Sequence, residues 1–431
     1  MKVMGIDIGT TSVGLSVLDR QTRRQVKAET IPGGSFIRTD RPWEKLQKVD
    51  EIEKKVIDAV QELLSEFKDI EAIGLTGQMH GILYIDRKGI CVSPLYTWQD
   101  GRGGRKDFEG KSLTEEIYTK TGIHVYSGYG WVTHLYNQRK NLVPETAASF
   151  CTIADYIGMR LTGRESPLIH SSMAASFGFF DLEKGQFRTD LLKDLGVTGD
   201  ILPDTTTKVA PLGKFRGIPV YTAIGDNQAS VLGAAGREPG SILINMGTGG
   251  QISVISDRNI QIPGIETRPF LDENYLLAGA SLCGGRAYAV LENFFRQYGK
   301  AAGIGDCPQY DIMDKILKEA QPEEPLLVRT TFQGTRMHPD MRGSIEGISE
   351  ENFTPAALIN GVLRGMAREL YHMYREISEQ IKLEVPVLAA SGNGIRKNPW
   401  LQKAFEEVFE KKLALSPYIE EAACGAAVSC L

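Results

Sequence analysis

Two segments far apart in the 431-residue chain share one pattern, and this repetition constrains the fold more than any other feature. GIDIGTTSVG occupies residues 5–14, and INMGTGGQIS occupies residues 244–253. In each, apolar residues alternate with small or polar ones, glycine and threonine interrupt the run, and the alternation resumes. Alternation with a period of two predicts strands, and the interruption predicts the turn of a β-hairpin. Because helical patterns follow both hairpins, the sequence favours two matched α/β halves.

The first half is predicted to add a helix and further strands to its hairpin. Apolar residues from Leu46 to Phe67 recur at helical spacing, and polar pairs such as Asp50 and Lys54 stand four residues apart. This spacing predicts a helix over residues 44–67. Strands are expected at residues 4–8, 13–17, 25–31 and 70–76.

The second half is predicted to repeat this plan. Threonine is a preferred N-cap and proline is favoured in the first helical position, so Thr354-Pro355 predicts a helix that runs to about residue 382. Asn398-Pro399 opens another helix in the same way. Strands are expected at residues 220–224, 241–246, 251–255 and 386–390. No low-complexity linker separates the halves, so we expect domains at residues 1–224 and 225–431, divided where a strand meets GDNQAS.

Composition and charge exclude several classes of protein. A net charge of −5 gives no support for a nucleic-acid partner. Apolar runs such as Ile242 to Met246 are too short to span a membrane. The N-terminus lacks the apolar stretch of a signal peptide, so a cytoplasmic location is expected. The six cysteines form no C-x-x-C pair, which argues against a disulfide framework or a thiolate zinc site.

The glycine–threonine turns are candidate phosphate sites. Backbone N–H groups of such a turn can point outward together, glycine permits close approach, and threonine adds a hydroxyl donor. For the first turn alone, an ordinary hairpin with Asp7 as an edge charge is the simpler interpretation. The alternative is that the turn and Asp7 converge on a phosphate and its magnesium ion. A second turn of the same kind favours this alternative, with two turns gripping the phosphates of one nucleotide.

Asp226 follows a predicted strand and precedes a predicted helix. Two roles are open for this position. Aspartate is a common helix N-cap. In the second role, an aspartate acts as a general base and accepts a proton from a substrate hydroxyl as that hydroxyl attacks phosphorus.

Three further stretches are candidate ligand sites. AASGNGIRKN at residues 389–398 follows a strand, and its glycines would let an adenine ring lie against the backbone; an ordinary turn is the alternative. GLTGQMHG at residues 74–81 sets Gln78 and His80 at the end of a strand, where open α/β sheets bind ligands. WQDGR at residues 98–102 suits a polyol or is a charged surface loop, and GRGGRKD at residues 101–107 is expected to be solvated.

Taken together, these motifs resemble the FGGY carbohydrate kinases, within the actin-like ATPase superfamily. The resemblance is collinear and covers nearly the whole chain. It also includes FQGTRMHPDMRGSIEGI at residues 332–348 and EEAACGAA at residues 420–427. It implies an α/β fold of two actin-like ATPase (ribonuclease H-like) domains with a deep cleft between them. It also implies transfer of the ATP γ-phosphate to a primary hydroxyl of a sugar or polyol, with Mg²⁺. From the charge and the short apolar runs we expect no nucleic-acid partner and no membrane.

The resemblance implies a role for individual residues. Asp226 matches the catalytic base, and Asp7 matches the magnesium-associated aspartate, which holds the metal directly or through water. Nucleotide-binding positions are matched by Gly9, Thr10, Thr11, Gly247, Thr248, Gly249, Gly392, Asn393 and Gly394. Substrate-facing positions are matched by Gln78, Met79, His80, Trp98, Asp100, Asp226 and Asn227.

The sugar is less tightly specified. Q-M-H-G and D-N resemble xylulose kinases, whereas GYGWVTHLYN at residues 128–137 and SSMAASFGFFD at residues 171–181 are more similar to sedoheptulose kinases. We therefore expect a ketose kinase that converts sedoheptulose to sedoheptulose 7-phosphate, with D-xylulose as the alternative substrate. Two other classes are remote alternatives, a sugar-independent actin-like ATPase and a non-catalytic sugar sensor. Dimers are frequent in the family, which leaves a homodimer open.

Overall fold

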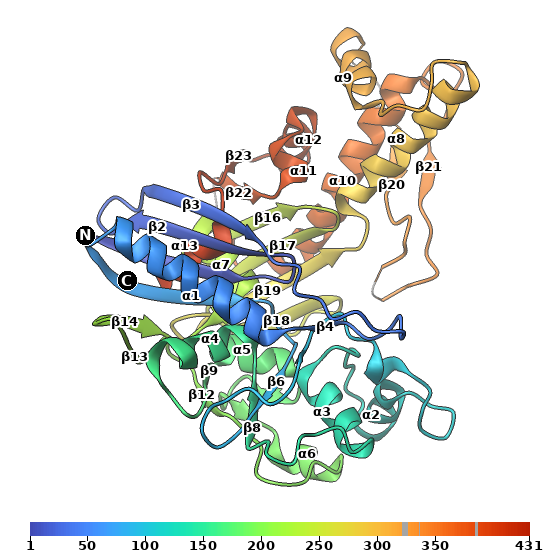
Figure 1. Cartoon of the computed structure of the whole chain (residues 1–431). Coiled ribbons are helices and arrows are strands. Elements are labelled where there is room, and N and C mark those ends of the chain that lie inside the picture. Colours follow the sequence, from blue (N-terminus) through green and yellow to red (C-terminus); the bar gives the residue numbers. More distant parts are fainter. Residues whose placement is uncertain (321–325, 336, 384–386) are drawn as a thin grey trace. The chain divides into compact units, whose positions relative to one another are not determined.

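The computed structural model describes residues 1–320, 326–335, 337–383 and 387–431. The chain (Figure 1) divides into two compact units. Unit 1 comprises Met1–Gly236, Arg268–Asn274 and Tyr418–Leu431, and unit 2 comprises Arg237–Thr267 and Tyr275–Pro417. Both combine sheets with helices, as the predicted α/β class requires. The boundary between residues 224 and 225 stays a prediction.

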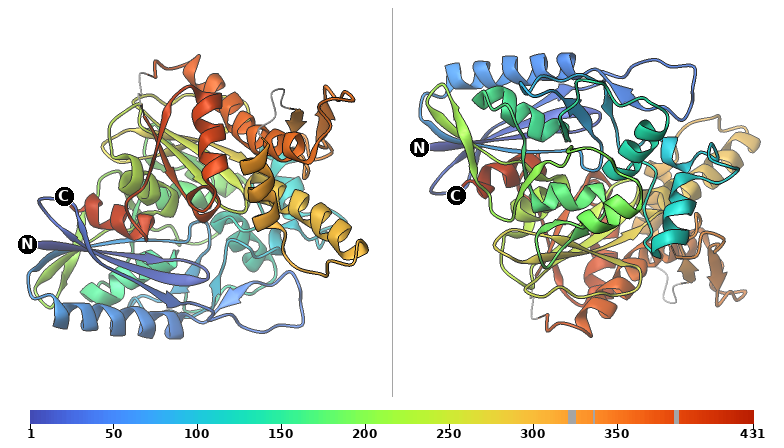
Figure 2. Two further views of the ribbon diagram at one scale, coloured as in Figure 1. Left: turned by 90° about the horizontal axis from the view of Figure 1, so that it is seen from above. Right: turned by 90° about the horizontal axis from the view of Figure 1, so that it is seen from below.

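Unit 1 is built on a seven-stranded sheet. Its strands run in the order β13 (Pro211–Phe215), β14 (Ile218–Tyr221), β5 (Ile70–Gly77), β1 (Lys2–Ile8), β2 (Ser12–Asp19) and β3 (Gln25–Pro32), and β15 (Ile224–Gly225) also pairs with β5. Strands β1 and β2 form the predicted antiparallel hairpin, and β1 pairs with β5 in parallel. Figure 2 shows α1 (Val49–Glu66) along one face of this sheet and α13 (Glu421–Ser429) against the other.

The rest of unit 1 consists of short elements around this sheet. They are β4 (Leu46–Gln47), β6 (Leu83–Ile85), β7 (Leu95–Tyr96), η1 (Arg102–Gly104), α2 (Leu113–Thr121), α3 (Gly130–Arg139), β8 (Ser149–Cys151), α4 (Ile153–Thr162), β9 (Leu168–His170), α5 (Ser171–Ala174), η2 (Ala175–Phe177), β10 (Phe180–Asp181), β11 (Gln186–Phe187), α6 (Thr189–Asp194), β12 (Asp204–Thr206) and α7 (Asp226–Ala235).

Two predicted boundaries in unit 1 are wrong. The helix expected from residue 44 begins only at Val49, because Leu46–Gln47 pairs with Leu95–Tyr96 as a short antiparallel ladder. The strand expected over 220–224 is interrupted after Tyr221. At this point Thr222 forms two hydrogen bonds with Ala210 instead of continuing the strand. The Thr222 N–H donates to the Ala210 carbonyl at 2.9 Å, and the Ala210 N–H donates to the Thr222 hydroxyl at 3.1 Å.

Unit 2 is built on a six-stranded sheet. Its order is β18 (Ile265–Pro269), β19 (Tyr275–Ser281), β17 (Gly250–Ser256), β16 (Ile242–Met246), β22 (Val387–Ser391) and β23 (Lys412–Leu415). Strands β16 and β17 form the second predicted hairpin. The remaining elements are α8 (Gly284–Ala301), α9 (Tyr310–Glu319), β20 (Leu327–Arg329), β21 (Ser344–Glu346), α10 (Pro355–Ser378), α11 (Asn393–Arg396) and α12 (Pro399–Phe409).

The helix starts predicted in unit 2 are confirmed. The Thr354 hydroxyl accepts the N–H of Ala357 at 3.2 Å, and the Asn398 side chain accepts the N–H of Leu401 at 3.1 Å. Helix α10 ends at Ser378, however, four residues before the predicted end. The expected strand over 386–390 is β22, and its predicted first residue, Pro386, lies outside the described residues, as does Arg336 of the 332–348 segment.

Helix α13 packs against its neighbours at backbone distance. A Cβ added to Gly5 on β1 would lie 1.7 Å from the Ala423 carbonyl oxygen. One added to Gly425 on α13 itself would lie 1.7 Å from the Ala229 carbonyl oxygen of α7. Only glycine permits such approach. The small residues of EAACGAA therefore let β1 and α7 both pack directly against one helix, and these two elements carry Asp7 and Asp226.

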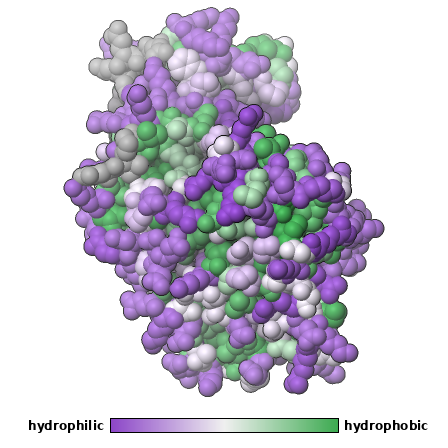
Figure 3. Space-filling model, turned by 90° about the vertical axis from the view of Figure 1, so that its left-hand side faces the viewer, coloured by the Kyte–Doolittle hydropathy of each residue, from purple (hydrophilic) through white to green (hydrophobic). Residues whose placement is uncertain are grey.

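The surface in Figure 3 is dominated by hydrophilic side chains, with smaller hydrophobic groups between them. Among the residues that the structure describes, no helix is both long enough and apolar enough to cross a membrane.

Candidate active site

Asp7 is a carboxylate without a compensating partner. It is the penultimate residue of β1, half-buried, and its Oδ1 is buried with no hydrogen bond to any described residue. Burial raises the pKa of Asp7 to about 8, and the negative charges of Asp226 and Glu420 act in the same direction. A cation beside this oxygen would relieve both effects. The Asp7 environment therefore fits a bound Mg²⁺ ion.

The described residues contain no group of three or more His, Cys, Asp or Glu side chains arranged to hold a metal unaided. Mg²⁺ typically takes one or two protein carboxylates and completes its shell with substrate phosphates and water. A single orphaned carboxylate oxygen at Asp7 is therefore the kind of ligand set expected when the phosphates arrive with the ion.

Asp226 opens helix α7 directly after the short strand β15. The N-cap is Gly225, so the structure does not support the cap role that the sequence left open for Asp226. Its Oδ1 accepts the N–H of Asn227 at 2.7 Å. Burial raises the pKa of Asp226, and the Asn227 N–H and the charge of Arg268 partly oppose this. A carboxylate with a raised pKa is a stronger proton acceptor than an exposed one.

The first glycine–threonine turn is joined to residues predicted to face the sugar. The Thr10 hydroxyl accepts the Trp98 indole N–H at 3.0 Å and donates to Gln78 Oε1 at 3.4 Å. Gln47 closes the network, because its side-chain amide donates to the Thr10 carbonyl at 2.8 Å and accepts from Gln78 at 3.0 Å. The structure thus brings Thr10, Gln78 and Trp98 together. Gly9 and Thr11 complete the turn, with Thr11 exposed.

His80 is held in a strained backbone conformation by two chain segments. Its φ of 70° lies in the left-handed region, which non-glycine residues rarely adopt. Its N–H donates to the Ser176 hydroxyl at 2.9 Å, and its Nδ1 lies 2.7 Å from the Ser176 carbonyl oxygen. The imidazole stacks on Tyr129 with ring centroids 4.6 Å apart. Such strain persists where the surroundings over-determine it, which is frequent at functional sites.

Gln47, Tyr129 and Ser176 were missed as site residues by the sequence prediction. Tyr129 and Ser176 lie in the two segments that resemble sedoheptulose kinases, so that resemblance was the available signal. Gln47 gave none. Met79, which was predicted, is buried, and a Cβ on Gly225 would lie 2.8 Å from its sulfur. Asn227, also predicted, accepts a hydrogen bond from Arg268 at 3.2 Å.

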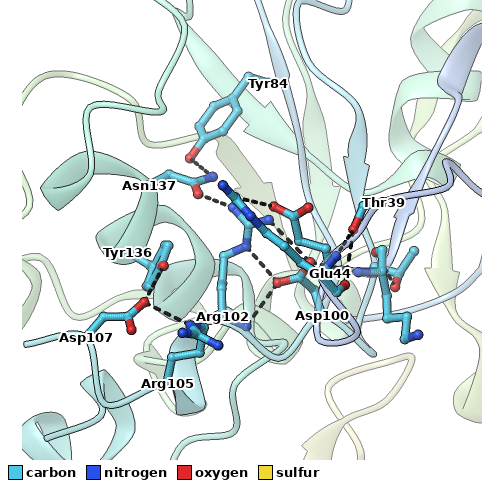
Figure 4. Close-up of polar contacts among 12 residues, drawn as sticks. Thr39, Glu44, Tyr84, Asp100, Arg102, Arg105, Asp107, Tyr136 and Asn137 are labelled. Carbon is cyan, nitrogen blue, oxygen red and sulfur yellow. Dashed lines mark hydrogen bonds and ion pairs between the residues drawn. The ribbon is translucent and has the colours of Figure 1, made fainter. Parts of the chain in front are cut away.

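Asp100 and Arg102 form a buried ion pair (Figure 4). Arg102 Nε donates to Asp100 Oδ1 at 2.7 Å, and the Lys45 N–H donates to Oδ2 at 3.0 Å. The guanidinium also binds the Asn137 side chain and lies 4.3 Å from the Tyr96 ring centre. The expectation that residues 101–107 are solvated is therefore wrong for Arg102, which is 2% exposed.

This ion pair occupies the Asp100 carboxylate, which is fully buried. Trp98, two residues earlier, is 48% exposed. The pair therefore fixes the loop that presents Trp98, while a direct contact between Asp100 and a sugar stays a prediction.

Unit 2 contains a large cavity beside the second glycine–threonine turn. The turn rests on the start of α8, since the Gly285 and Arg286 N–H groups donate to the Gly247 and Thr248 carbonyls, each at 3.0 Å. The cavity, of about 1040 Å³, has the size of a nucleotide site. Its walls include Gly247, Thr248, Asn393, Gly394, Arg286, Tyr288, Tyr310 and Trp400.

The predicted adenosine motif thus shares one cavity with the second turn. The two meet at Met246, because a Cβ on Gly392 or Gly394 would lie 2.6 or 2.7 Å from the Met246 carbonyl oxygen. Gly249 and Gly392 themselves are not among the residues that line the cavity.

Comparison with known proteins identifies the family of the chain. The model of the N-terminal domain of the FGGY family of carbohydrate kinases matches residues 2–233, and that of its C-terminal domain matches residues 242–431. Sedoheptulokinase of Mus musculus is 25% identical over 99% of this chain and 96% of its own length. Gluconokinase of Bacillus subtilis is 25% identical over 99% of this chain and 86% of its own length.

The fold has close counterparts among solved structures. The xylulose kinase of Rhodospirillum rubrum superposes with a TM-score of 0.83 at 22% identity, over 100% of this chain and 89% of that one. The predicted fold class, two α/β domains of the actin-like ATPase type, is confirmed. The chain belongs to the FGGY family of carbohydrate kinases, phosphotransferases whose acceptor is a sugar hydroxyl.

Proposed function

We propose that this protein transfers the γ-phosphate of ATP to the terminal primary hydroxyl of a ketose, and that sedoheptulose is its preferred substrate. ATP is the phosphate donor that sugar kinases of this family use. The product would be sedoheptulose 7-phosphate.

The environment of His80 carries the choice of sugar. Ser176 and Tyr129, which bond and stack on His80, come from the two segments that resemble sedoheptulose kinases. His80 lies one residue beyond Met79 and two beyond Gln78, all predicted to face the sugar. The coverage of 96% of the length of a sedoheptulokinase supports the same substrate.

Asp226 is proposed as the general base. Its carboxylate would accept the proton of the terminal hydroxyl as the hydroxyl oxygen bonds to the γ-phosphorus. The bond between the γ-phosphorus and the bridging oxygen breaks, and ADP leaves with that oxygen. The raised pKa of Asp226 suits it to hold the proton until release.

The other residues are proposed to bind and orient. Asp7 would hold Mg²⁺, which offsets the charge of the phosphates when bound. Thr11 and Thr248, with the glycines beside them, would donate N–H and hydroxyl groups to phosphate oxygens, and Thr10 would donate its N–H, because its hydroxyl donates to Gln78. Trp98 and Gln78 would position the sugar, and their hydrogen bonds to Thr10 would keep that position in register with the turn.

D-xylulose is the second candidate substrate. Gln78-Met79-His80 and Asp226-Asn227 resemble the corresponding stretches of xylulose kinases, and both stretches carry proposed catalytic or sugar-facing residues.

The test is ADP release by the purified protein with Mg²⁺ and ATP, across sedoheptulose, D-xylulose, D-ribulose, L-ribulose, gluconate and glycerol. We expect kcat/KM for sedoheptulose to exceed the others by about tenfold or more, as one or two well-placed polar contacts can provide. A preference for D-xylulose would overturn the assignment of sedoheptulose as the substrate and would leave the proposed phosphate transfer unchanged. ATP hydrolysis at one rate with and without sugars would indicate a sugar-independent ATPase. Sugar binding without turnover would indicate a sensor.

A further inference from the structure

Unit 2 has a second cavity that the proposed reaction does not use. It measures about 560 Å³ and shares no lining residue with the nucleotide cavity. Helix α10 provides one wall, the β20 and β21 segments provide another, and the residues beside β18 and β19 complete it. This volume suits a small organic molecule.

Arg368 of α10 lines this cavity without an ion pair to any described carboxylate. Arg329 and three glutamates, Glu346, Glu369 and Glu376, also line it, and Arg329 pairs with Glu346 at 3.6 Å. The Nη1 of Arg368 is buried and has no hydrogen bond to any described residue. Arg364, one turn earlier, is paired with Glu407 at 2.5 Å, whereas none of the ion pairs among the described residues includes Arg368. Burial and the charge of Arg364 lower the pKa of Arg368. A buried guanidinium nitrogen without an acceptor is costly, and a carboxylate or phosphate matches its geometry.

The other walls indicate what such an anion would carry. Three threonines line the same cavity: the Thr330 and Thr331 hydroxyls donate to Glu369 and to the Arg342 carbonyl, and the Thr335 hydroxyl accepts the His338 N–H at 3.0 Å. Ile265, Val328, Met341 and Met373 form apolar surface in the same cavity. Methionine side chains adapt to flat or irregular apolar groups. A bare inorganic ion would leave this surface uncovered.

We propose that this cavity binds a small organic anion, with its carboxylate or phosphate on Arg368 and its apolar part against Met341 and Met373, and that the bound anion alters nucleotide affinity. The second half of the proposal rests on the proposed use of ATP. The first half does not.

The connection to the nucleotide runs through Glu369, the next residue on α10. Its Oε2 accepts the Thr330 hydroxyl at 3.1 Å, and its side chain also bonds Ser281. Ser281 ends β19 and pairs with Gly250 of β17. A Cβ on Gly249 would lie 3.0 Å from the Ser281 carbonyl oxygen, so Ser281 lies directly against the second glycine–threonine turn. An anion that shifts the α10 side chains of this cavity would therefore act on the turn that is proposed to hold phosphate.

The experiment titrates the full-length protein with phenyl phosphate, benzoate and inorganic phosphate by calorimetry, with and without saturating ADP. Arg368→Gln removes the charge, and Arg368→Lys keeps it but loses the planar pair of donors. Arg375→Gln is the matched control, because Arg375 lies on the same helix, is 60% exposed and pairs with Glu379. Saturating ADP occupies the nucleotide site, so any probe that still binds with ADP present binds at another site.

We expect phenyl phosphate or benzoate to bind with ADP present, more tightly than inorganic phosphate. Loss of the charged hydrogen bond in Arg368→Gln should weaken binding by about 10–100-fold, and Arg375→Gln should leave it unchanged. The bound probe should change KM for ATP by about fivefold or more in the wild type and not in Arg368→Gln.

Any of three results would overturn the proposed site: that no probe binds, that binding is equal in the wild type and both Arg368 variants, or that ADP displaces every probe. Binding that depends on Arg368 without any effect on KM would support the site and overturn its coupling to the nucleotide. Because calorimetry needs no turnover, failure of the site is distinguishable from failure of the proposed kinase function.

Discussion

Replacing Asp7 by asparagine should stabilise the metal-free protein, although it removes a residue proposed to be essential. The asparagine side chain has the same size as that of aspartate and cannot ionise. In the wild type the pKa of Asp7 rises from 3.8 to about 8 on folding. Between these values the folded state holds a proton that the unfolded state has released, so wild-type stability falls as the pH rises.

The magnitude follows from the size of this shift. Each unit of pKa corresponds to about 1.4 kcal/mol, so a rise from 3.8 to about 8 sets an upper bound of about 6 kcal/mol. Because Asp7 is only half-buried, solvent screening reduces this, and the wild type should lose on the order of 2–5 kcal/mol between about pH 4 and pH 8 relative to Asp7→Asn. At roughly 2–4 °C per kcal/mol for a domain of 150–250 residues, the variant should melt about 4–20 °C higher near pH 8 and at the same temperature near pH 4.

The assay is calorimetric melting of both proteins in EDTA over this pH range, repeated with Mg²⁺ and ADP. Because the cation competes with the proton on Asp7, added Mg²⁺ should raise the wild-type Tm more at pH 8 than at pH 6 and should raise that of Asp7→Asn less. Asp69→Asn is the control for which the pH dependence has the opposite sign. The hydrogen bond from the Lys2 ammonium lowers the pKa of Asp69, so this variant should lose stability relative to the wild type as the pH rises through that range. A Tm difference between Asp7→Asn and wild type that is the same at every pH would refute the reasoning.

Three further predictions concern activity and stability. Asp226→Asn should lower kcat by roughly 10²–10⁴-fold with little change in KM for ATP, and unchanged turnover in steady-state assays would defeat the assignment of the base. Gly425→Ala should cost about 1–3 kcal/mol or more in denaturant unfolding, because its Cβ would meet the Ala229 carbonyl; a neutral effect would show that α13 can move away. Arg102→Leu should cost about 3–5 kcal/mol by leaving Asp100 buried and unpaired, and an unaltered Tm would contradict a buried pair.

The hairpins and the long helices could be predicted because their signals are local. Alternation around Gly9 and Gly247 and the caps at Thr354 and Asn398 each depend on a few neighbouring residues. The start of α1 could not be predicted, because residues 46–47 form a strand only through their pairing with residues 95–96.

For the site, the residue types at the turns and at Asp7 and Asp226 left structural alternatives open, and the resemblance to the family supplied their roles. These roles, and that of Gln78, stay predictions. The burial of Arg102 was not predictable, because a basic stretch normally indicates a solvated loop. Its environment is created by Asp100, Asn137 and the ring of Tyr96, which the fold brings together. The role of Gln47 as a link between Thr10 and Gln78 was hidden for the same reason.

The measurement that tests the central claim most directly is the yield of phosphorylated sugar per ADP. The protein is incubated with ATP, Mg²⁺ and sedoheptulose, and ADP, inorganic phosphate and sugar phosphate are quantified together by ³¹P NMR. A carbohydrate kinase whose Asp226 acts on the terminal hydroxyl should form one sedoheptulose 7-phosphate for each ADP, with almost no inorganic phosphate. ADP accompanied by an equal amount of inorganic phosphate and no sugar phosphate would contradict the account.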